Sequence, residues 1–189
     1  GCDMLSTTGR KYLRGPRGTG LLYIRRSVLE QLEPVMLALH AAQWTSRDTY
    51  TVRDDARRFE NWETNYAAKI GLGGALDYAL GWGIDPIWER IQLLAGQLRT
   101  SLNAIPGVTV RDIGELQGGI VTFTIDGRDL TEAKQALAAQ SINVTVSSTP
   151  STRLDMEDRG LTQVVRASVH YYNSEDEVSR FCSAIERLA

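Results

Sequence analysis

The pattern of hydrophobic and polar positions changes about halfway along the chain. An apolar run over residues 20–26 predicts a buried strand, and apolar residues at helical spacing predict a helix from residue 66 to about residue 80. From residue 85 onward, short strand-like segments alternate with helical ones. The predicted order there is helix, strand, strand, helix, strand, strand, helix, which is typical of a small sheet with helices on one face.

Three segments of this second half carry clear signals. Asp85-Pro86 supplies a cap residue and a first-turn proline, and predicts a helix to about residue 103. Residues 120–125 alternate as a half-buried strand should. Asn173-Ser174 precedes a final helix whose acidic first turn complements the helix dipole. We expect residues 85–189 to form one α+β domain.

Two long segments show neither the helical nor the strand period of apolar residues. Residues 35–58 mix apolar and polar residues, and residues 147–160 are rich in serine, threonine and charged residues. Long irregular segments inside compact proteins are usually functional or lie at an interface. We expect both to be loops, and for residues 35–58 a plain solvent loop is an equally good interpretation.

A glycine-rich segment around one lysine carries the strongest chemical signal. Lys11 follows Thr8-Gly9-Arg10, and Gly15, Gly18 and Gly20 come soon after it. Glycine lets the backbone approach a ligand closely and turn its N–H groups toward anionic oxygens. A lysine amine can condense with an aldehyde to give a Schiff base. From the residues alone, a structural strand–turn–strand joint is an equal alternative.

This segment resembles the lysine segment of the class V aminotransferases, a branch of the fold-type-I pyridoxal-phosphate (PLP) enzymes. The family pattern places an aspartate in an apolar strand, then two small residues, His, Gln or Arg, the lysine, and a later Gly-x-small. Cys2–Leu5, Thr8–Lys11 and Gly18–Gly20 fit it in order. The resemblance implies that PLP is the cofactor, that Lys11 forms its Schiff base, and that Thr8 and Arg10 lie near its phosphate.

The resemblance also implies an α/β fold with two parts. Residues 1–84 would be the C-terminal part of the large PLP-binding domain with a connecting helix, and residues 85–189 the small α+β C-terminal domain. The chain lacks an initiator methionine and opens two residues before a strand, so we expect it to be the C-terminal part of a longer protein.

A second family segment surrounds the sequence Arg-Phe-Glu at residues 58–60. In the family, a threonine soon after it reaches the cofactor phosphate of the neighbouring subunit. Thr64 is the candidate here, although Glu63 beside it departs from the family pattern and would repel a phosphate. The resemblance therefore implies a homodimer with Thr64 as a cofactor-binding residue.

The closing motif of the family is matched by Arg166, Ser168, Tyr172 and Asn173 at the family's spacing. In the family this arginine holds the α-carboxylate of the substrate, and a guanidinium suits that role because it grips a carboxylate with two parallel hydrogen bonds. From the residues alone, Arg166 would instead pair with an acid of residues 155–157.

The implied function is that of a PLP-dependent, aminotransferase-like enzyme that acts on the Cα amine of an amino acid through the lysine Schiff base. A carbon–sulfur lyase or an epimerase of the same family is an alternative. Cysteine desulfurases of the family carry a nucleophilic cysteine in the loop before the closing arginine, and residues 147–160 contain none. A second alternative is a non-catalytic fragment that serves folding or dimerisation.

Composition excludes several other classes. A formal net charge of −2 gives no signal for nucleic acid, and no apolar run reaches the roughly 20 residues of a membrane-spanning helix. Cys2 and Cys182 lie far apart without CxxC spacing, which favours a reducing cytoplasm over a disulfide scaffold. His40 and His170 are not spaced as a pair of metal-ligating histidines. We therefore expect a cytoplasmic protein that binds neither nucleic acid, membranes nor a metal ion.

Overall fold

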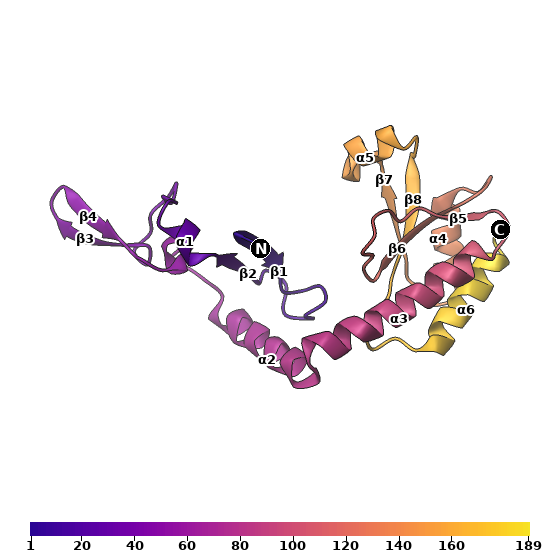
Figure 1. The fold of residues 1–189 in the computed structure, drawn as a ribbon, viewed down its shortest axis with the longest axis horizontal. Coiled ribbons are helices and arrows are strands. Elements are labelled where there is room, and N and C mark those ends of the chain that lie inside the picture. Colours follow the sequence, from indigo (N-terminus) through magenta and orange to yellow (C-terminus); the bar gives the residue numbers. More distant parts are fainter. The chain divides into compact units, whose positions relative to one another are not determined.

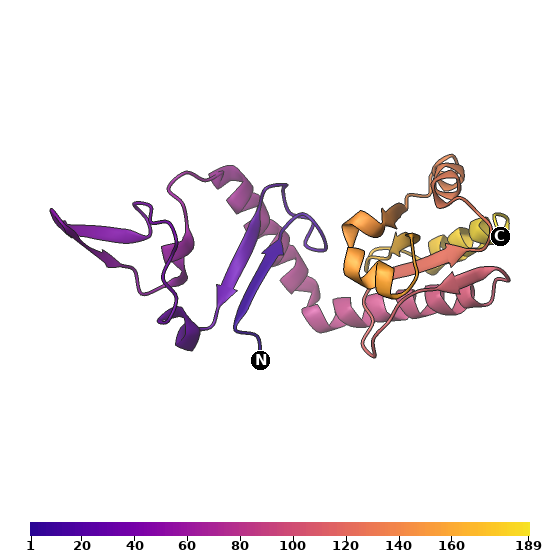
Figure 2. The same cartoon turned by 90° about the horizontal axis from the view of Figure 1, so that it is seen from above.

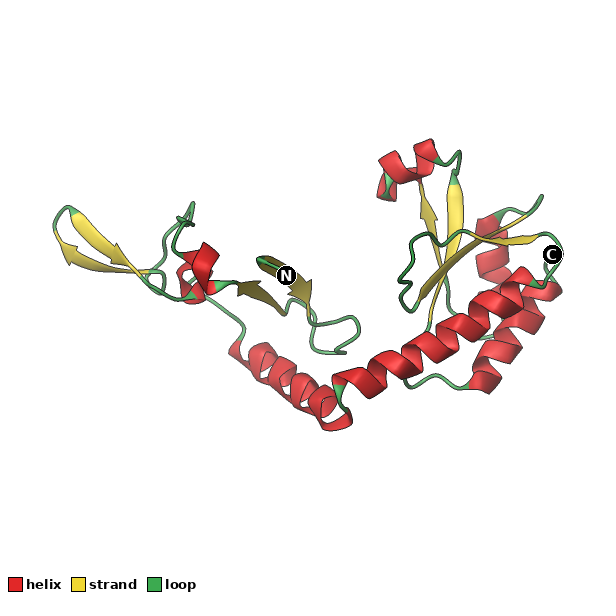
Figure 3. Ribbon diagram, in the orientation of Figure 1, coloured by secondary structure: helices red, strands yellow, loops and turns green.

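The computed structural model describes residues 1–189 and contains two compact units, Gly1–Trp82 and Gly83–Ala189 (Figure 1). The first unit holds two separate antiparallel hairpins, and the second holds a four-stranded sheet (Figure 3). None of the helices could span a lipid bilayer, because each is too short or too polar. The elements of the first unit are β1 (Met4–Thr8), β2 (Gly20–Ile24), α1 (Arg26–Leu29), β3 (Ala42–Ser46), β4 (Thr49–Val52), η1 (Ala56–Phe59) and α2 (Tyr66–Trp82).

The hairpin of β1 and β2 is closed by an unusually near approach of two backbones. Thr8 faces Gly20 across the ribbon. A Cβ atom on Gly20 would lie 2.2 Å from the carbonyl oxygen of Thr7, a separation that no side chain tolerates. The N–H of Gly9 then donates to the carbonyl of Thr19 at 2.8 Å and carries the pairing into the turn. The strands can hold this register only with glycine at position 20.

Helix α2 packs against the turn that follows β1 (Figure 2). Leu72, which is 7% exposed, fills the space that a side chain on Gly9 would need, since a Cβ there would lie 2.6 Å from Cδ1 of Leu72. On the same side, the guanidinium of Arg14 lies 5.1 Å from the ring centre of Tyr78, a cation–π contact. The helix therefore supports the turn that carries Lys11.

Residues 35–58 are not the loop expected from the sequence, because they contain the hairpin of β3 and β4 and the short helix η1. Trp44 pairs with Tyr50 across this hairpin, and both side chains are largely exposed. Aromatic cross-strand pairs stabilise a hairpin without a buried face. A hairpin that is exposed on both faces has no hydrophobic period, so its strands could not be found from the pattern.

The second unit is an antiparallel sheet in the order β5-β6-β8-β7. Helices α3, α4 and α6 share one apolar core with it, centred on Phe123, Val165 and Ile185. This confirms the predicted order of elements, apart from an additional short helix. The elements are α3 (Ile84–Asn103), β5 (Val108–Val110), β6 (Ile120–Ile125), α4 (Leu130–Ala138), β7 (Thr145–Ser148), η2 (Thr149–Ser151), α5 (Arg153–Asp158), β8 (Gln163–Ser168) and α6 (Glu175–Glu186).

That additional helix corrects the expected loop at residues 147–160. These residues contain the end of β7, the single turn η2 and the six-residue helix α5. Met156 of α5 is 1% exposed, and ion pairs four residues apart lie on both sides of it. A helix of fewer than two turns shows no hydrophobic period, which explains why the sequence pattern missed it. The predicted cap at Asp85 is wrong, because this helix begins at Ile84 with Gly83 as its cap residue and Asp85 in its first turn.

A buried ion pair ties α3 to the sheet. Nε of Arg99 donates to Asp112 at 2.7 Å, and the two side chains are 12% and 8% exposed. The other carboxylate oxygen of Asp112 accepts the backbone N–H of Thr122 at 2.7 Å and its hydroxyl at 2.6 Å. Because Thr122 faces Arg166 across β6 and β8, this network also fixes the strand beside that arginine.

Replacing Gly20 with alanine is expected to separate β2 from β1, because the new Cβ has no space beside the carbonyl of Thr7. We expect a local loss of about 1–3 kcal/mol, measured as faster amide hydrogen exchange over residues 4–8 and 20–24. Gly73→Ala on α2 is the matched control, since nothing lies within 4 Å of a Cβ there. Equal exchange in the two variants would contradict the close backbone approach.

Replacing Asp112 with alanine leaves Arg99 buried without its counter-charge. We expect the free energy of unfolding of the second unit to fall by about 3–5 kcal/mol, measured by urea denaturation. Glu157→Gln, which breaks the exposed pair with Arg153, should change the midpoint little. A double variant, Arg99→Met with Asp112→Leu, should recover much of the loss, and a double variant no more stable than Asp112→Ala would show that the charge is not the cause.

Candidate functional site

Lys11 lies on a turn whose backbone is fixed while its side chain is left available. The N–H of Arg14 donates to the carbonyl of Lys11 at 2.9 Å, and the N–H of Gly15 donates to Gly9 at 2.8 Å. Arg14 closes the turn in the left-handed region, at φ 56°. The Lys11 side chain is exposed and forms no ion pair or hydrogen bond within the chain. A rigid backbone with an unpaired amine suits a lysine that forms a covalent bond to a cofactor.

Thr8 and Arg10 lie on the same turn as Lys11. Thr8 is half-buried, and its hydroxyl lies 3.5 Å from the carbonyl oxygen of Thr19, at the limit of a hydrogen bond. Arg10 is exposed and has no ion pair or hydrogen bond within the chain. One turn thus offers an amine, a hydroxyl and a guanidinium, each largely available. This donor set fits PLP, which carries an aldehyde for the amine and a phosphate for the other two groups.

Thr64 lies elsewhere in the first unit, in the wall of a cavity of about 580 Å³ beside β1 and β2. Thr8, Arg10 and Lys11 do not line this cavity. Its ionisable groups balance, since two carboxylates face two cations, and Nζ of Lys69 lies 3.9 Å from one of those carboxylates. The charged residues in this wall are Arg57, Glu60, Glu63 and Lys69. Within one chain the cavity offers a phosphate no excess positive charge.

Arg166 lies on β8, between Thr122 of β6 and Thr145 of β7. Its neighbours Val165 and Ala167 point into the core, so Arg166 points to the opposite face of the sheet, where it is half-buried and lines a cavity of about 320 Å³. The guanidinium forms no ion pair or hydrogen bond within the chain. Lys11 and Arg166 belong to different units.

The pairing of Arg166 with an acid, which the residues alone favoured, does not occur. Asp155 instead pairs with Arg159 at 3.0 Å, and Glu157 pairs with Arg153 at 2.6 Å. Both pairs join residues four apart on α5, a spacing at which helical side chains meet. The Arg166 guanidinium therefore has both of its edges available for a carboxylate.

Three hydroxyl side chains in this cavity were not identified from the sequence as site residues. Ser147, Ser151 and Thr152 line it from β7, from η2 and from the residue before α5. None of the three hydroxyls makes a hydrogen bond within the chain. The serine- and threonine-rich composition of residues 147–152 was the available signal, but only the fold of α5 shows that these residues lie beside Arg166.

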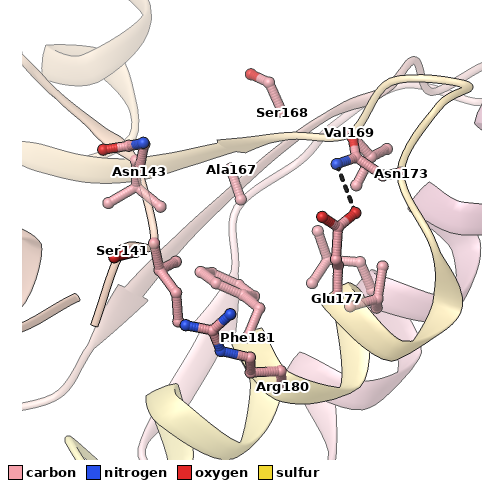
Figure 4. Close-up of a pocket in the computed structure, with 13 residues that line it drawn as sticks. Ser141, Asn143, Ala167, Ser168, Val169, Asn173, Glu177, Arg180 and Phe181 are labelled. Carbon is pink, nitrogen blue, oxygen red and sulfur yellow. Dashed lines mark hydrogen bonds between the residues drawn. The ribbon is translucent and has the colours of Figure 1, made fainter. Parts of the chain in front are cut away.

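A separate cavity of about 190 Å³ lies at the start of α6 (Figure 4). Three of its polar side chains, Asn173, Glu177 and Arg180, are already engaged. Asn173 donates to Glu177 at 3.0 Å, and this bond lowers the pKa of the Glu177 carboxyl below its usual value. Ser174 and Glu177 complete a capping box, and Arg180 donates to the carbonyl of Gln140. None of the predicted site residues lines this cavity, and Glu177 serves to begin the helix.

The two cysteines lie outside the Arg166 cavity. Cys2 is exposed just before β1, whereas Cys182 is 9% exposed in the core face of α6. Burial raises the pKa of the Cys182 thiol above its ordinary value, which disfavours the reactive thiolate. No group of three or more His, Cys, Asp or Glu side chains is arranged to hold a metal ion.

Comparison with known proteins identifies the family. A sequence model of the aminotransferase class-V family matches residues 1–181. A protein of Methanothermobacter thermautotrophicus named probable cysteine desulfurase is 31% identical over 100% of this chain and 48% of its own length. The chain spans about half the length of the curated relatives it matches.

Solved structures agree with this assignment. The apo cysteine desulfurase of Thermococcus onnurineus is 29% identical, with a TM-score of 0.87 over 98% of this chain and 46% of that one. A cystine C–S lyase, solved with glycine covalently linked to its PLP cofactor, is 24% identical with a TM-score of 0.81 over 97% of this chain and 46% of that one.

These findings confirm the resemblance predicted from the lysine segment and the closing motif. They confirm the predicted fold class, part of a fold-type-I PLP fold, and they support pyridoxal 5′-phosphate as the cofactor. The chain belongs to the aminotransferase class-V family of PLP enzymes.

Proposed function

We propose that the protein containing this chain acts on the Cα amine of an amino acid, with PLP held covalently at Nζ of Lys11 and the substrate carboxylate bound by Arg166. The unpaired guanidinium of Arg166 is the observation that carries this proposal. It faces a cavity in which the carboxylate of Asp155 is already paired with Arg159. A guanidinium left unpaired in a cavity is suited to an anionic ligand.

The roles of the residues follow from their chemistry. When bound, PLP supplies an electron sink for negative charge at Cα. The amine of Lys11 can hold the cofactor and move a proton to and from Cα. Arg166 grips the carboxylate with two parallel hydrogen bonds, which fixes the orientation of the remaining bonds at Cα. The hydroxyl of Thr8 and the guanidinium of Arg10 bind the phosphate, with Thr64 serving the neighbouring subunit.

The reaction type has three candidates. Aminotransferase-like chemistry follows from the family, and carbon–sulfur lyase chemistry is favoured by the names of the relatives. The lyase candidate would release sulfur as a free thiol or sulfide unless a cysteine upstream of this chain accepts it, because residues 147–160 contain no cysteine and Cys182 is buried. An epimerase that uses the same residues is the third candidate. The alternative of a non-catalytic fragment applies only to the isolated chain.

We also propose that the whole protein is a cytoplasmic homodimer, with residues 1–84 belonging to its large PLP-binding domain. Exposed apolar side chains of the first unit support this assembly. Helix α2 is apolar on several faces, yet only Leu72 and Ala79 are buried. A helix of that composition is usually covered by further protein.

Covalent attachment of the cofactor is testable with the full-length protein. Borohydride treatment after incubation with PLP is expected to fix one pyridoxyl group on the peptide that contains Lys11, read by mass spectrometry. Lys11→Ala should lose the label together with the visible absorbance band of the bound cofactor. Lys134→Ala is the matched control and should keep both. Label found on Lys69 or Lys134 instead would contradict the assignment of Lys11 as the cofactor-binding lysine.

The carboxylate role of Arg166 predicts a defect specific to substrate binding. Arg166→Met should raise KM for the amino acid by roughly 10- to 100-fold, and Arg166→Lys should restore only part of it, because lysine lacks the paired hydrogen bonds. Arg153→Met, an exposed arginine outside the cavity, is the control. The assay offers a series of amino acids and measures the keto acid, ammonia and sulfide formed from each. Release of sulfide would distinguish a lyase from an aminotransferase. An unchanged KM in Arg166→Met would contradict the role.

A further inference from the structure

The cavity around Arg166 contains an ion pair that determines its charge. Three of its lining side chains are ionisable, namely Asp155, Arg159 and Arg166. Nη1 of Arg159 lies 3.0 Å and 3.3 Å from the two carboxylate oxygens of Asp155, and Nη2 donates to the carbonyl of Arg111. Arg159 is therefore held by the carboxylate of Asp155 and by the carbonyl of Arg111. The cavity carries one net positive charge, and the available one is on Arg166.

The rest of the wall offers no second cation. Ser147, Ser151 and Thr152 contribute unbonded hydroxyls, and apolar contact comes from residues such as Ile120 and Val164. A ligand that places one carboxylate on Arg166 therefore meets hydroxyl groups and apolar surface around its remaining atoms. The only other ionic groups that such a ligand could meet are Asp155 and Arg159, which neutralise each other and therefore offer a second acid no free counter-charge.

We propose that Asp155 is a specificity-determining residue: by holding Arg159, it restricts the cavity to amino acids with a single carboxylate and an uncharged side chain. This inference rests on the proposed function, in which Arg166 binds the substrate α-carboxylate. A second carboxylate would lose its hydration without gaining a counter-charge, which is unfavourable in a partly enclosed site. An uncharged side chain loses less and can use the free hydroxyls.

Changing one charge should therefore change the substrate class. Asp155→Asn keeps the shape of the side chain but removes its charge, so Arg159 becomes a second cation in the wall. A dicarboxylic amino acid would then find one guanidinium for each carboxylate. Glu157→Gln is the matched control, because Glu157 has the same i,i+4 pairing on the same helix but does not line the cavity.

The test uses the full-length protein with isotope-labelled arginine, titrated with L-alanine and with L-aspartate, which differ by the second carboxylate. Binding is followed by NMR at the Nε–H signals of Arg159 and Arg166, and the amide spectrum checks that each variant is folded. We expect the unsubstituted chain to bind alanine roughly tenfold more tightly than aspartate. Asp155→Asn should improve aspartate binding roughly tenfold and leave alanine binding within about twofold.

A second variant tests the same role of Asp155 if Asp155→Asn does not fold. Arg159→Gln leaves Asp155 unpaired beside the ligand, so it should weaken the binding of aspartate more than that of alanine. Unchanged aspartate binding in Asp155→Asn, or an equal gain in Glu157→Gln, would overturn the role of Asp155 while leaving the proposed function intact. If alanine does not move the Arg166 signal at all, the carboxylate site fails, and both proposals fail with it.

Discussion

The buried ion pair between Arg99 and Asp112 is the interaction on which the candidate substrate site depends. One oxygen of the carboxylate neutralises the guanidinium, and the other accepts both the N–H and the hydroxyl of Thr122. A shift of β6 would therefore expose a buried charge and break three hydrogen bonds together. Because Arg166 lies opposite Thr122, its place on the sheet is held by a network in which it takes no part. That separation lets the guanidinium remain unpaired.

In the first unit, too, the residues that hold the backbone are different from those proposed to bind the ligand. Leu72 and the backbone around Gly9 and Gly20 hold the turn, and these contacts involve no functional side chain. Lys11 and Arg10 stay free of internal partners. A group that must bind a ligand loses affinity if it first has to leave a partner in the protein, so preorganised but unpaired groups are expected at binding sites. In both units, the supporting contacts are made by other residues, and the candidate cations Arg10, Lys11 and Arg166 have no internal partner.

The strongly periodic elements could be predicted from the sequence, and the short ones could not. Helices α3 and α6 and strand β6 have one buried face each, which leaves a regular apolar pattern. The hairpin of β3 and β4 is exposed on both faces, and α5 has only six residues, so neither leaves such a pattern. The candidate site, too, could be predicted only in part. Arg166 could be predicted through a motif, but the alternative from the residues alone, a pair with Asp155 or Glu157, is wrong, because those acids pair within α5.

Helix α5 also bears on the chemistry of sulfur. A persulfide mechanism needs a thiol that can approach the substrate, and the segment before the closing arginine is where the family carries it. In this chain that segment is ordered: Met156 is buried, and two ion pairs stabilise the single short helix. Its contribution to the Arg166 cavity is a wall of hydroxyls and one paired carboxylate. Residues that form such a wall can select a substrate, but they cannot accept sulfur from it. In this chain, residues 147–160 therefore offer the Arg166 cavity hydroxyl groups and a paired charge, but no thiol.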